Sequence, residues 1–221
     1  RYGAAELAED NRIKRFIEKP PVGTAPSNLI NAGAYVLGQK IFNYIPEGRA
    51  VSIEYEVFPK LTKEGGLYGY VFEGLWMDIG KPEDYLEVNK TLITSIANQQ
   101  KCKIGNETEI KKPVAFDKEV SIGEKSVIGP HVVLGRNVIA GNNVHIQNSV
   151  ILRETVISDF VSMDGAIIGE GVFIGKRVKI GKGCILGDHV KIKDDISLAE
   201  RVLICPAKEI SESVLTPKCI T

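Results

Sequence analysis

An aliphatic residue returns every six residues through the second half of the chain, and this period limits the possible folds more than any other feature. A glycine most often follows it, as at Gly123, Gly129 and Gly135. A short fixed period is typical of stacked units that bury their apolar faces jointly. The pattern predicts a parallel β-helix. Its aliphatic positions, with five-residue steps after Leu152 and Met163, are Ile122, Ile128, Leu134, Ala140, Ile146, Leu152, Ile157, Met163, Ile168, Ile174, Ile180, Leu186 and Ile192.

Each hexad predicts one short wall and one corner of a triangular prism. Alternate strand residues face opposite sides, so the first and fifth residues of a hexad should both point inward. The glycine is expected where the chain turns a corner, either because a Cβ would clash or because φ must be positive. Apolar residues expected to face outward could dock a second prism, which predicts a homo-oligomer through the β-helix. These residues are Val127, Val133, Ile139, Ile151 and Phe173.

The amino-acid sequence of the repeat also resembles that of a known family. The run from Val120 to Ile192, with IGEKSVIGPHVVLGRNVIAG and IGEGVFIGKRVKIGKGCILG, resembles the hexapeptide-repeat left-handed β-helix family. The resemblance implies a left-handed path, although parallel crossovers are generally right-handed. A sandwich of short strands is the alternative, but it would show turn signals at wider spacing and no glycine register.

The first hundred residues are patterned as a mixed α/β unit. A hairpin is expected from Tyr2 to Glu18, and further strands from apolar runs. Ser52 is expected to cap one helix, and Pro82 stands in the first turn of another. We therefore expect an α/β domain over residues 1–100, a linker over 101–113 and the β-helix over 114–221. The other expected strands are Leu29 to Leu37, Leu67 to Phe72 and Leu75 to Ile79, and the last helix should bury Tyr85, Leu86, Leu92, Ile93 and Ile96.

Four sequence blocks in this region resemble the C-terminal half of a sugar-phosphate nucleotidyltransferase domain. Their residues are similar to those of mannose-1-phosphate guanylyltransferases. The blocks are RIKRFIEKP, NAGAYVL, SIEYEVFPKL and LWMDIGKPEDYLEVNK. The implied fold is the α/β C-terminal portion of a Rossmann-like nucleotidyltransferase domain followed by a left-handed parallel β-helix. The family domain opens with a strand and a glycine-rich loop that this sequence does not show. We therefore expect the N-terminal half of the catalytic domain to be missing and this chain alone to be inactive and to bind nucleoside triphosphate weakly.

The resemblance implies a reaction and assigns residues to it. A sugar 1-phosphate, taken as mannose 1-phosphate, attacks the α-phosphorus of a nucleoside triphosphate, taken as GTP, and pyrophosphate leaves. Cationic groups and a divalent metal must offset the approach of negative charges. By resemblance Lys19 pairs with the sugar phosphate, and Asp78 is a catalytic carboxylate that holds Mg²⁺. The substrate-binding residues implied are Gly3, Glu18, Lys19, Asn31 and Gly33.

Ordinary structural roles could also explain these residues. Glu-Lys-Pro is a common exposed strand end, and Asp78 could simply cap the helix that begins near Lys81. Two other functions remain open. Hexapeptide β-helices also form acyltransferases, for which His145 would be the general base among His131, His145 and His189. The chain could instead be a non-catalytic regulatory or oligomerisation subunit of a nucleotidyltransferase.

Composition excludes some classes of partner. Lys plus Arg equals Asp plus Glu, at 28 each, with no basic block, which argues against binding to nucleic acid or anionic lipid. No apolar run is long enough to span a membrane, and no signal peptide is visible. The four cysteines form no CxxC pair, so we expect reduced thiols in a cytoplasmic protein.

Overall fold

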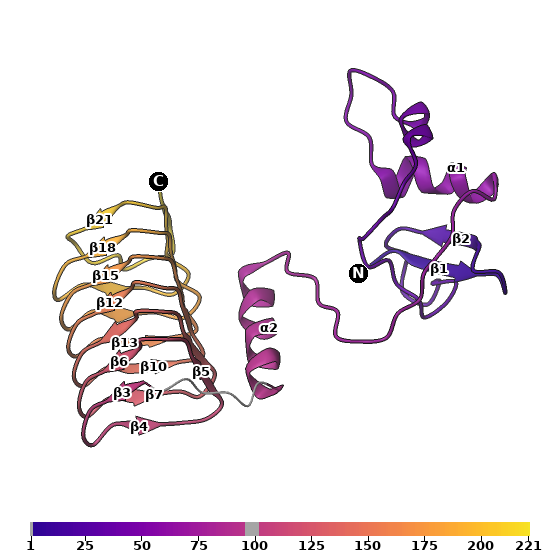
Figure 1. Ribbon diagram of the computed structural model, residues 1–221. Helices are drawn as coiled ribbons and strands as arrows, with labels where there is room; N and C mark the ends of the chain where they lie inside the picture. The colour runs from indigo at the N-terminus through magenta and orange to yellow at the C-terminus, as the bar shows by residue number, and fades with distance from the viewer. Residues whose placement is uncertain (1, 96–101) are drawn as a thin grey trace. The chain divides into compact units, whose positions relative to one another are not determined.

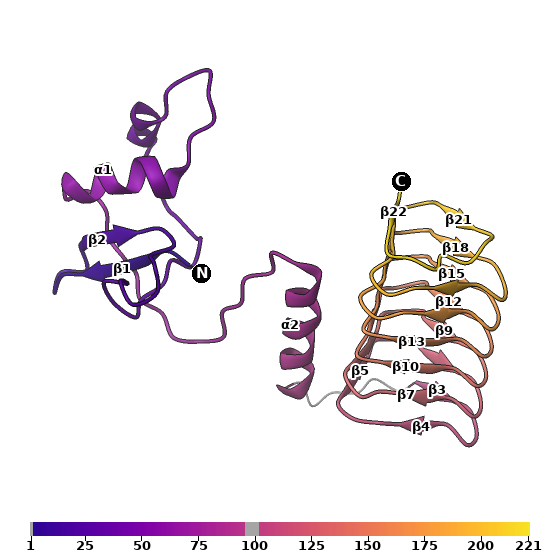
Figure 2. The ribbon, with the colours of Figure 1, turned by 180° about the vertical axis from the view of Figure 1, so that it is seen from behind.

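The computed structural model describes residues 2–95 and 102–221, which form two compact units (Figure 1). The first unit is Arg1–Trp76 and the second is Met77–Thr221. The first unit contains the hairpin strands and three short helical segments. The second contains one longer helix and the β-helix, which Figure 2 shows from behind. The helical segments are the 3₁₀ helix Gln39–Tyr44, the π-helix Ile53–Val57, α1 Phe58–Lys63 and α2 Pro82–Ser95.

The predicted hairpin is confirmed at the start of the first unit. Strand β1 (Ala4–Leu7) pairs antiparallel with β2 (Ile13–Ile17). Asn11 turns the chain between them with φ 65°, a conformation that asparagine adopts more readily than most residues. The N-terminal cap at Ser52 is also confirmed, because its side chain accepts a hydrogen bond from the Tyr55 backbone N–H (3.3 Å).

The other three strands predicted for this region are wrong. Leu29 to Leu37, Leu67 to Phe72 and Leu75 to Ile79 form no strand in the described chain. Two isolated antiparallel bridges, Ala4 with Ile30 and Arg12 with Tyr68, are the pairings found there. A strand needs a partner along its length, and among the described residues these apolar runs pair at isolated positions at most, so many of their side chains stay exposed.

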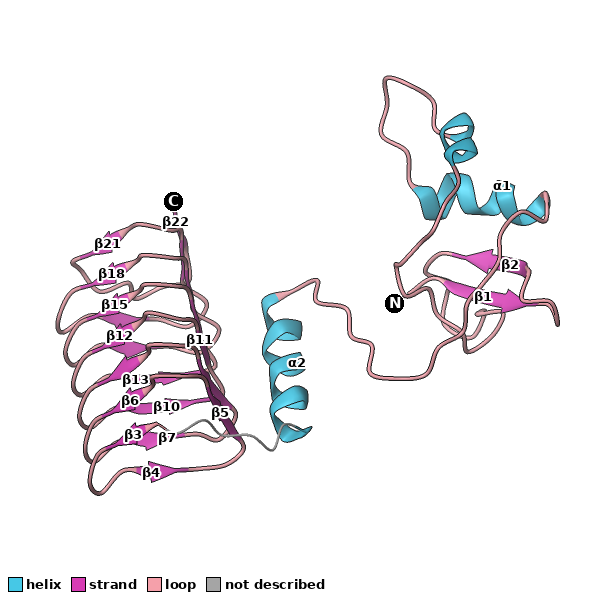
Figure 3. Cartoon of the chain, viewed as in Figure 1, coloured by secondary structure: helices cyan, strands magenta, loops and turns pink. Residues whose placement is uncertain are grey.

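The second unit is a parallel β-helix with three walls (Figure 3), which confirms the fold predicted from the hexads. Two walls have seven strands and one has six. Wall 1 consists of β3 Lys103–Ile104, β6 Ser121–Ile122, β9 Ile139–Ala140, β12 Val156–Ile157, β15 Phe173–Ile174, β18 Lys191–Ile192 and β21 Glu209–Ile210. Wall 2 consists of β4 Glu109–Ile110, β7 Val127–Ile128, β10 His145–Gln147, β13 Ser162–Asp164, β16 Lys179–Ile180 and β19 Ser197–Leu198. Wall 3 consists of β5 Val114–Phe116, β8 Val132–Leu134, β11 Val150–Ile151, β14 Ile167–Ile168, β17 Ile185–Leu186, β20 Leu203–Ile204 and β22 Cys219–Ile220.

The β-helix starts earlier than expected, because β3 and β4 fall inside the predicted linker over residues 101–113. They pair with β6 and β7 in the same register as all later coils. Ile104 is 45% exposed because it belongs to the first coil and has a neighbour on one side only. The boundary between the units also differs from the expected one, since it falls between Trp76 and Met77 and places α2 with the β-helix.

One register error concerns two adjacent apolar residues. Ile151 is fully buried, whereas Leu152 is 37% exposed, so the inward series passes through Ile151. The paired residues Ile146 and Met163 are 17 residues apart, as are Met163 and Ile180, whereas Ile110 and Ile128 or Ile180 and Leu198 are 18 apart. Each of these two 17-residue coils loses its residue at the corner between walls 2 and 3. The prediction that Ile151 faces outward is therefore wrong.

The glycine after each inward aliphatic is required mainly by close approach of the next coil. A Cβ on Gly123 would lie 2.6 Å from the Gly141 backbone carbonyl, well inside contact distance. Of the glycines in this series, Gly129 has a positive φ, at 107°. The left-handed corner positions are filled mostly by other residues, including His131 (φ 57°) and His189 (φ 59°).

Helix α2 lies against wall 3 (Figure 3), where it contacts β5 and β8. Outward-facing Val150 on this wall is 3% exposed, which fits cover by the helix. Of the helix residues predicted to be buried, Ile93 is buried, Tyr85 and Leu86 are half-buried, and Leu92 is 40% exposed. Ile96 lies outside the described residues.

The described part of the chain contains no helix with the length and apolarity that a bilayer crossing requires.

Candidate functional site

Three of the predicted sugar-binding residues meet in the first unit. The Asn31 backbone N–H donates to the Gly3 carbonyl oxygen (2.8 Å). A Cβ on Gly3 would collide with the Glu18 carboxylate and would lie 3.3 Å from the Asn31 Cβ. Glycine is therefore the residue that allows the carboxylate and the amide to approach the β1 strand closely. The hairpin positions Gly3 and Glu18, and the turn after Ile30 brings Asn31 to them.

Both polar atoms of the Asn31 side-chain amide form hydrogen bonds. Its Oδ1 accepts a hydrogen bond from the Gly33 backbone N–H (3.0 Å), and its Nδ2 donates to the Tyr35 hydroxyl (2.7 Å). Gly33 has φ 76°, so it makes the turn that closes the first of these bonds. An amide carries two donors and two acceptor lone pairs. One of each therefore remains for a ligand, in a fixed orientation.

Tyr35 and Glu54 extend this network, and the sequence had not singled them out as site residues. The Tyr35 hydroxyl donates to Glu54 Oε1 (3.3 Å). Burial raises the pKa of Tyr35 from its ordinary value, and the charges of Glu54 and Glu18 raise it further. The phenol is therefore neutral at physiological pH and remains a donor. Tyr35 lies in the NAGAYVL block and Glu54 lies in the SIEYEVFPKL block.

Aromatic rings support the cluster. Tyr35 and Phe16 each pack edge to face against Phe58, with ring centroids 4.9 and 5.4 Å apart. Trp76 packs edge to face on Tyr2 at 5.0 Å, and its indole N–H donates to the Ala32 carbonyl oxygen (3.1 Å). Trp76 thus packs on an aromatic ring and also fixes the backbone between Asn31 and Gly33 through its hydrogen bond.

Lys19 and Asp78 belong to different units. Lys19 is exposed at the end of β2, directly after Glu18, and has φ 46°. Asp78 is exposed in the second unit, with its carboxylate beside Gly80. No group of three or more His, Cys, Asp or Glu side chains that could hold a metal ion occurs in the described part of the chain. Asp78 therefore offers a single hard oxygen donor group, which fits Mg²⁺ because that ion binds few carboxylates and keeps phosphates and waters.

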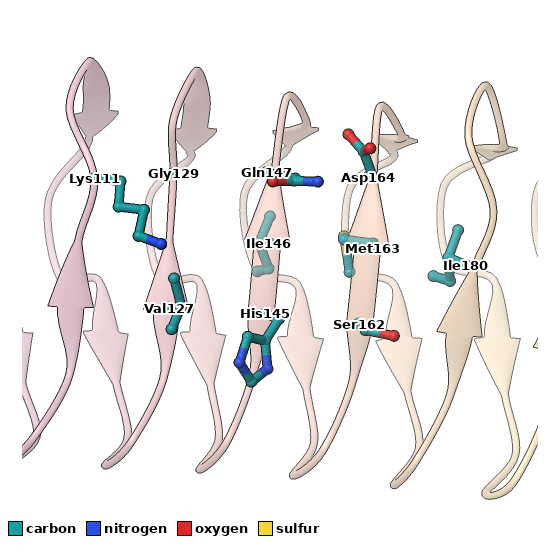
Figure 4. A pocket seen from close by; sticks show the side chains of 10 residues that line it. All are labelled: Lys111, Val127, Gly129, His145, Ile146, Gln147, Ser162, Met163, Asp164 and Ile180. Atoms are coloured by element: carbon teal, nitrogen blue, oxygen red, sulfur yellow. The ribbon is translucent and has the colours of Figure 1, made fainter.

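The histidines are distributed over the β-helix. His131 and His189 sit at corners, and His131 Nδ1 lies 3.3 Å from Asn148 Oδ1. His145 is exposed on wall 2 beside a shallow pocket of about 350 Å³, where Figure 4 shows it next to Ser162 on the neighbouring strand. Asp164 in the same pocket already accepts a hydrogen bond from Asn148 Nδ2 (2.8 Å).

Comparison with known proteins matches both halves of the chain. A family model described as "Nucleotidyl transferase" matches residues 1–95, and one described as "GMPPB C-terminal domain" matches residues 110–220. A mannose-1-phosphate guanylyltransferase of Mycobacterium tuberculosis is 40% identical over 43% of this chain and 27% of its own length. A mannose-1-phosphate guanyltransferase of Saccharomyces cerevisiae is 38% identical over 50% of this chain and 30% of its own.

A third relative, mannose-1-phosphate guanylyltransferase 1 of Arabidopsis thaliana, is 36% identical over 53% of this chain and 32% of its own length. The chain thus spans about three tenths of the length of these curated relatives. Most of the parallel β-helix lies in the region matched by the GMPPB C-terminal domain model. The Asn31 cluster lies in the region matched by the nucleotidyl transferase model. The chain therefore belongs to the family described as "GMPPB C-terminal domain", whose model matches half of it, and its residues 1–95 match the nucleotidyl transferase model.

Proposed function

We propose that this chain is part of an enzyme that makes a nucleotide-sugar, GDP-mannose, from mannose 1-phosphate and GTP with release of pyrophosphate. The observation that carries the proposal is the Gly3, Glu18 and Asn31 cluster. Its amide is fixed by Gly33 and Tyr35. The names of the relatives support the substrates.

The side chains of the first unit suit the sugar phosphate. The Glu18 carboxylate accepts hydrogen bonds from sugar hydroxyls, and the Asn31 amide can donate and accept. The Lys19 ammonium, exposed beside them, offsets the charge of the phosphate as it approaches the triphosphate. Both reactants are anionic and repel each other. The protein therefore contributes mainly by holding the nucleophilic oxygen in line and by offsetting the negative charge.

Asp78 is proposed to supply one carboxylate to Mg²⁺. When bound, the ion neutralises phosphate charge during transfer. The Asp78 carboxylate is exposed, so a hydrated ion could reach it. The proposal also includes a homo-oligomer through the β-helix and a cytoplasmic location. The latter is supported by the four free cysteines of the described chain.

The test is calorimetric titration of the chain with mannose 1-phosphate, with glucose 1-phosphate as competitor. We expect Tyr35→Phe to weaken sugar-phosphate binding about fivefold, because it removes a hydrogen bond of about 1 kcal/mol that orients Asn31 while keeping the ring on Phe58. Tyr44→Phe is the matched control, since the Tyr44 hydroxyl bonds Glu64 away from the cluster. A wild-type chain that binds neither sugar phosphate would overturn the proposal.

The pyrophosphate-release assay asks a separate question. With mannose 1-phosphate, GTP and Mg²⁺ it reports whether the chain itself completes the transfer, and we expect no turnover by this chain alone. Binding of sugar phosphate without turnover supports the assignment of the site. Turnover would contradict the expectation that triphosphate binding needs further residues.

A further inference from the structure

The last described coil of the β-helix brings two of the four cysteines together. Cys205 directly follows β20, and Cys219 begins β22, which pairs in parallel with β20 at one end of wall 3 (Figure 2). Cys219 is in register with Leu203, so Cys205 stands two residues further along the neighbouring strand, on the same outer face. Cys219 is exposed and Cys205 is half-buried, so solvent can reach this pair.

The position of Cys205 directs its side chain toward β22. In three earlier coils of wall 3 the residue at this position is glycine, namely Gly135, Gly169 and Gly187. A Cβ on Gly187 would lie 2.7 Å from the Pro206 backbone nitrogen of the next coil. The Cβ at this position therefore points along the prism axis at the following coil. For Cys205 that coil contains β22, and the Cys205 thiol forms a side-chain hydrogen bond with the Cys219 thiol.

We propose that Cys205 and Cys219 are a site of reversible disulfide formation that fastens the last coil of the β-helix. Both cysteines are free thiols in this structure. A disulfide requires sulfur atoms about 2 Å apart, which is closer than two thiols in contact, so the end of β22 must move toward Cys205. β22 can move because it lies at the edge of its sheet and pairs with β20 alone among the described strands.

The oxidant that suits an exposed thiol is a small disulfide such as oxidised glutathione. The Cys219 thiolate attacks one glutathione sulfur, and one glutathione thiolate leaves. The Cys205 thiolate then attacks the Cys219 sulfur of this mixed disulfide, and the second glutathione thiolate leaves. Each cysteine gives up one proton, which a departing thiolate takes up. The protein thiols are oxidised and one glutathione disulfide is reduced to two glutathione molecules. An excess of reduced glutathione reverses both steps.

The environment of each thiol sets its reactivity. Desolvation raises the pKa of Cys219 above its ordinary value, and the adjacent Cys205 thiol raises it further. Exchange at Cys219 should therefore be slow at neutral pH and faster in mild alkali. Cys184 is buried, and its thiol donates to the Ala199 carbonyl oxygen (3.0 Å). Cys102 precedes β3 in the first coil, at the other end of the stack, so it cannot take part in this bridge.

The bond would restrain a coil that has few attachments. Between β21 and β22 the chain returns to wall 2 through an isolated bridge of Val214 with Leu198. Residues 215–219 are exposed. The backbone N–H groups of Leu203 and Cys205 donate to carbonyl oxygens at residues 218 and 220 (2.9 and 2.8 Å). A cross-link across this stretch should therefore slow the opening of the coil and protect these two N–H groups from exchange.

Thiol titration of the full chain tests the site. The chain is incubated with excess oxidised glutathione in mild alkali, and its thiols are then counted in denaturant. We expect the count to fall from four to two, with a mass that shows the loss of two hydrogens and no bound glutathione. Hydrogen exchange followed by mass spectrometry should show the Leu203 and Cys205 amides exchanging about tenfold more slowly after oxidation.

Two serine variants complete the test. Cys102→Ser is the matched control and should still form the bridge. Cys205→Ser should abolish it and leave Cys219 carrying one glutathione, and circular dichroism reports whether each variant is folded. A wild type that keeps four thiols, that stops at the mixed disulfide, or that loses thiols no differently from Cys205→Ser would overturn the proposal. None of these residues belongs to the sugar-phosphate site, so the outcome leaves the proposed function untouched.

Discussion

The two units of this protein bury their apolar residues to very different degrees. The β-helix encloses a continuous core in which Ile128, Leu134, Ile151 and Ile168 are fully buried. In the first unit Val22, Val36 and Tyr70 are more than nine-tenths exposed, and few residues besides Val57 and Phe58 are fully enclosed. In the β-helix each coil packs on the next, so a short segment already has its partner. In the first unit the described strands form one local hairpin, and the pairings over longer separations are isolated bridges, so its apolar runs lack such partners.

The largest expected consequence is a difference in stability between the units. Trp76, the single tryptophan, belongs to the first unit, whereas far-ultraviolet circular dichroism mainly reports the β-helix. We expect the fluorescence transition in urea to precede the dichroism transition by about 1 M or more, which a difference of a few kcal/mol would produce. Trp76→Phe should remove the early signal and leave the later one. Coincident transitions would show that the units unfold together.

The next effect separates two adjacent residues of the β-helix. Ile151→Ala should lower the free energy of unfolding by about 2–5 kcal/mol, because Ile151 is fully buried. Leu152→Ala should change it by only about 0.5 kcal/mol, since Leu152 is partly exposed on the outer surface. Urea denaturation followed by circular dichroism measures both. Equal losses would mean that the inward series passes through Leu152 after all.

A smaller effect is expected for a buried hydroxyl. Ser149 Oγ donates to the Gln147 carbonyl oxygen (2.6 Å) and accepts from the Ala166 backbone N–H (3.0 Å). Ser149→Ala leaves that N–H without its partner and should cost about 1–3 kcal/mol. Ser162→Ala, on the outer face of wall 2, is the control and should be nearly neutral in the same denaturation experiment. A loss at Ser162 as large as that at Ser149 would contradict the assignment.

The smallest effect is a pH dependence at the surface. Hydrogen bonds from Arg177 (2.6 and 2.7 Å) lower the pKa of Asp195 below its ordinary value. The pair's contribution is therefore complete above the unfolded pKa and is lost as the pH falls through the lower folded pKa. We expect wild type and Arg177→Gln to differ slightly in melting temperature at neutral pH and to converge in acid. High salt should reduce the difference as well. A difference that persists in acid and in high salt would contradict this account.

The sequence predicted the β-helix because the six-residue aliphatic period that specifies it can be recognised within a short segment. It missed the buried polar positions, where Ser126, Ser149 and Thr155 replace an apolar residue and bond to corner backbone. It also misplaced the short step by one residue, since Leu152 is as apolar as Ile151. Composition alone cannot say which of two such neighbours turns inward, whereas the pairing of Val150 with Val133 decides it.

The candidate site was only partly accessible from sequence. Glu18 and Asn31 came from two of the quoted blocks and Gly3 from a separate match in the resemblance, and the structure brings the three together. The link from Asn31 through Tyr35 to Glu54 could not be read from spacing. It spans 19 residues between Tyr35 and Glu54 and depends on how the turn at Gly33 directs the chain. The predicted strands of the first unit failed because an apolar run does not reveal whether a partner strand lies beside it, and these runs form isolated bridges at most.

The coils that take 17 residues keep the strand pairing of those that take 18. Rise along the axis is therefore set by the hydrogen-bonded walls, while residue number is set by the corners. Deletions of one residue at the corner between walls 2 and 3 leave every neighbouring strand at its original level. Evolution could therefore shorten or lengthen such corners repeatedly without interrupting the β-helix, even where the six-residue period is no longer recognisable in the sequence.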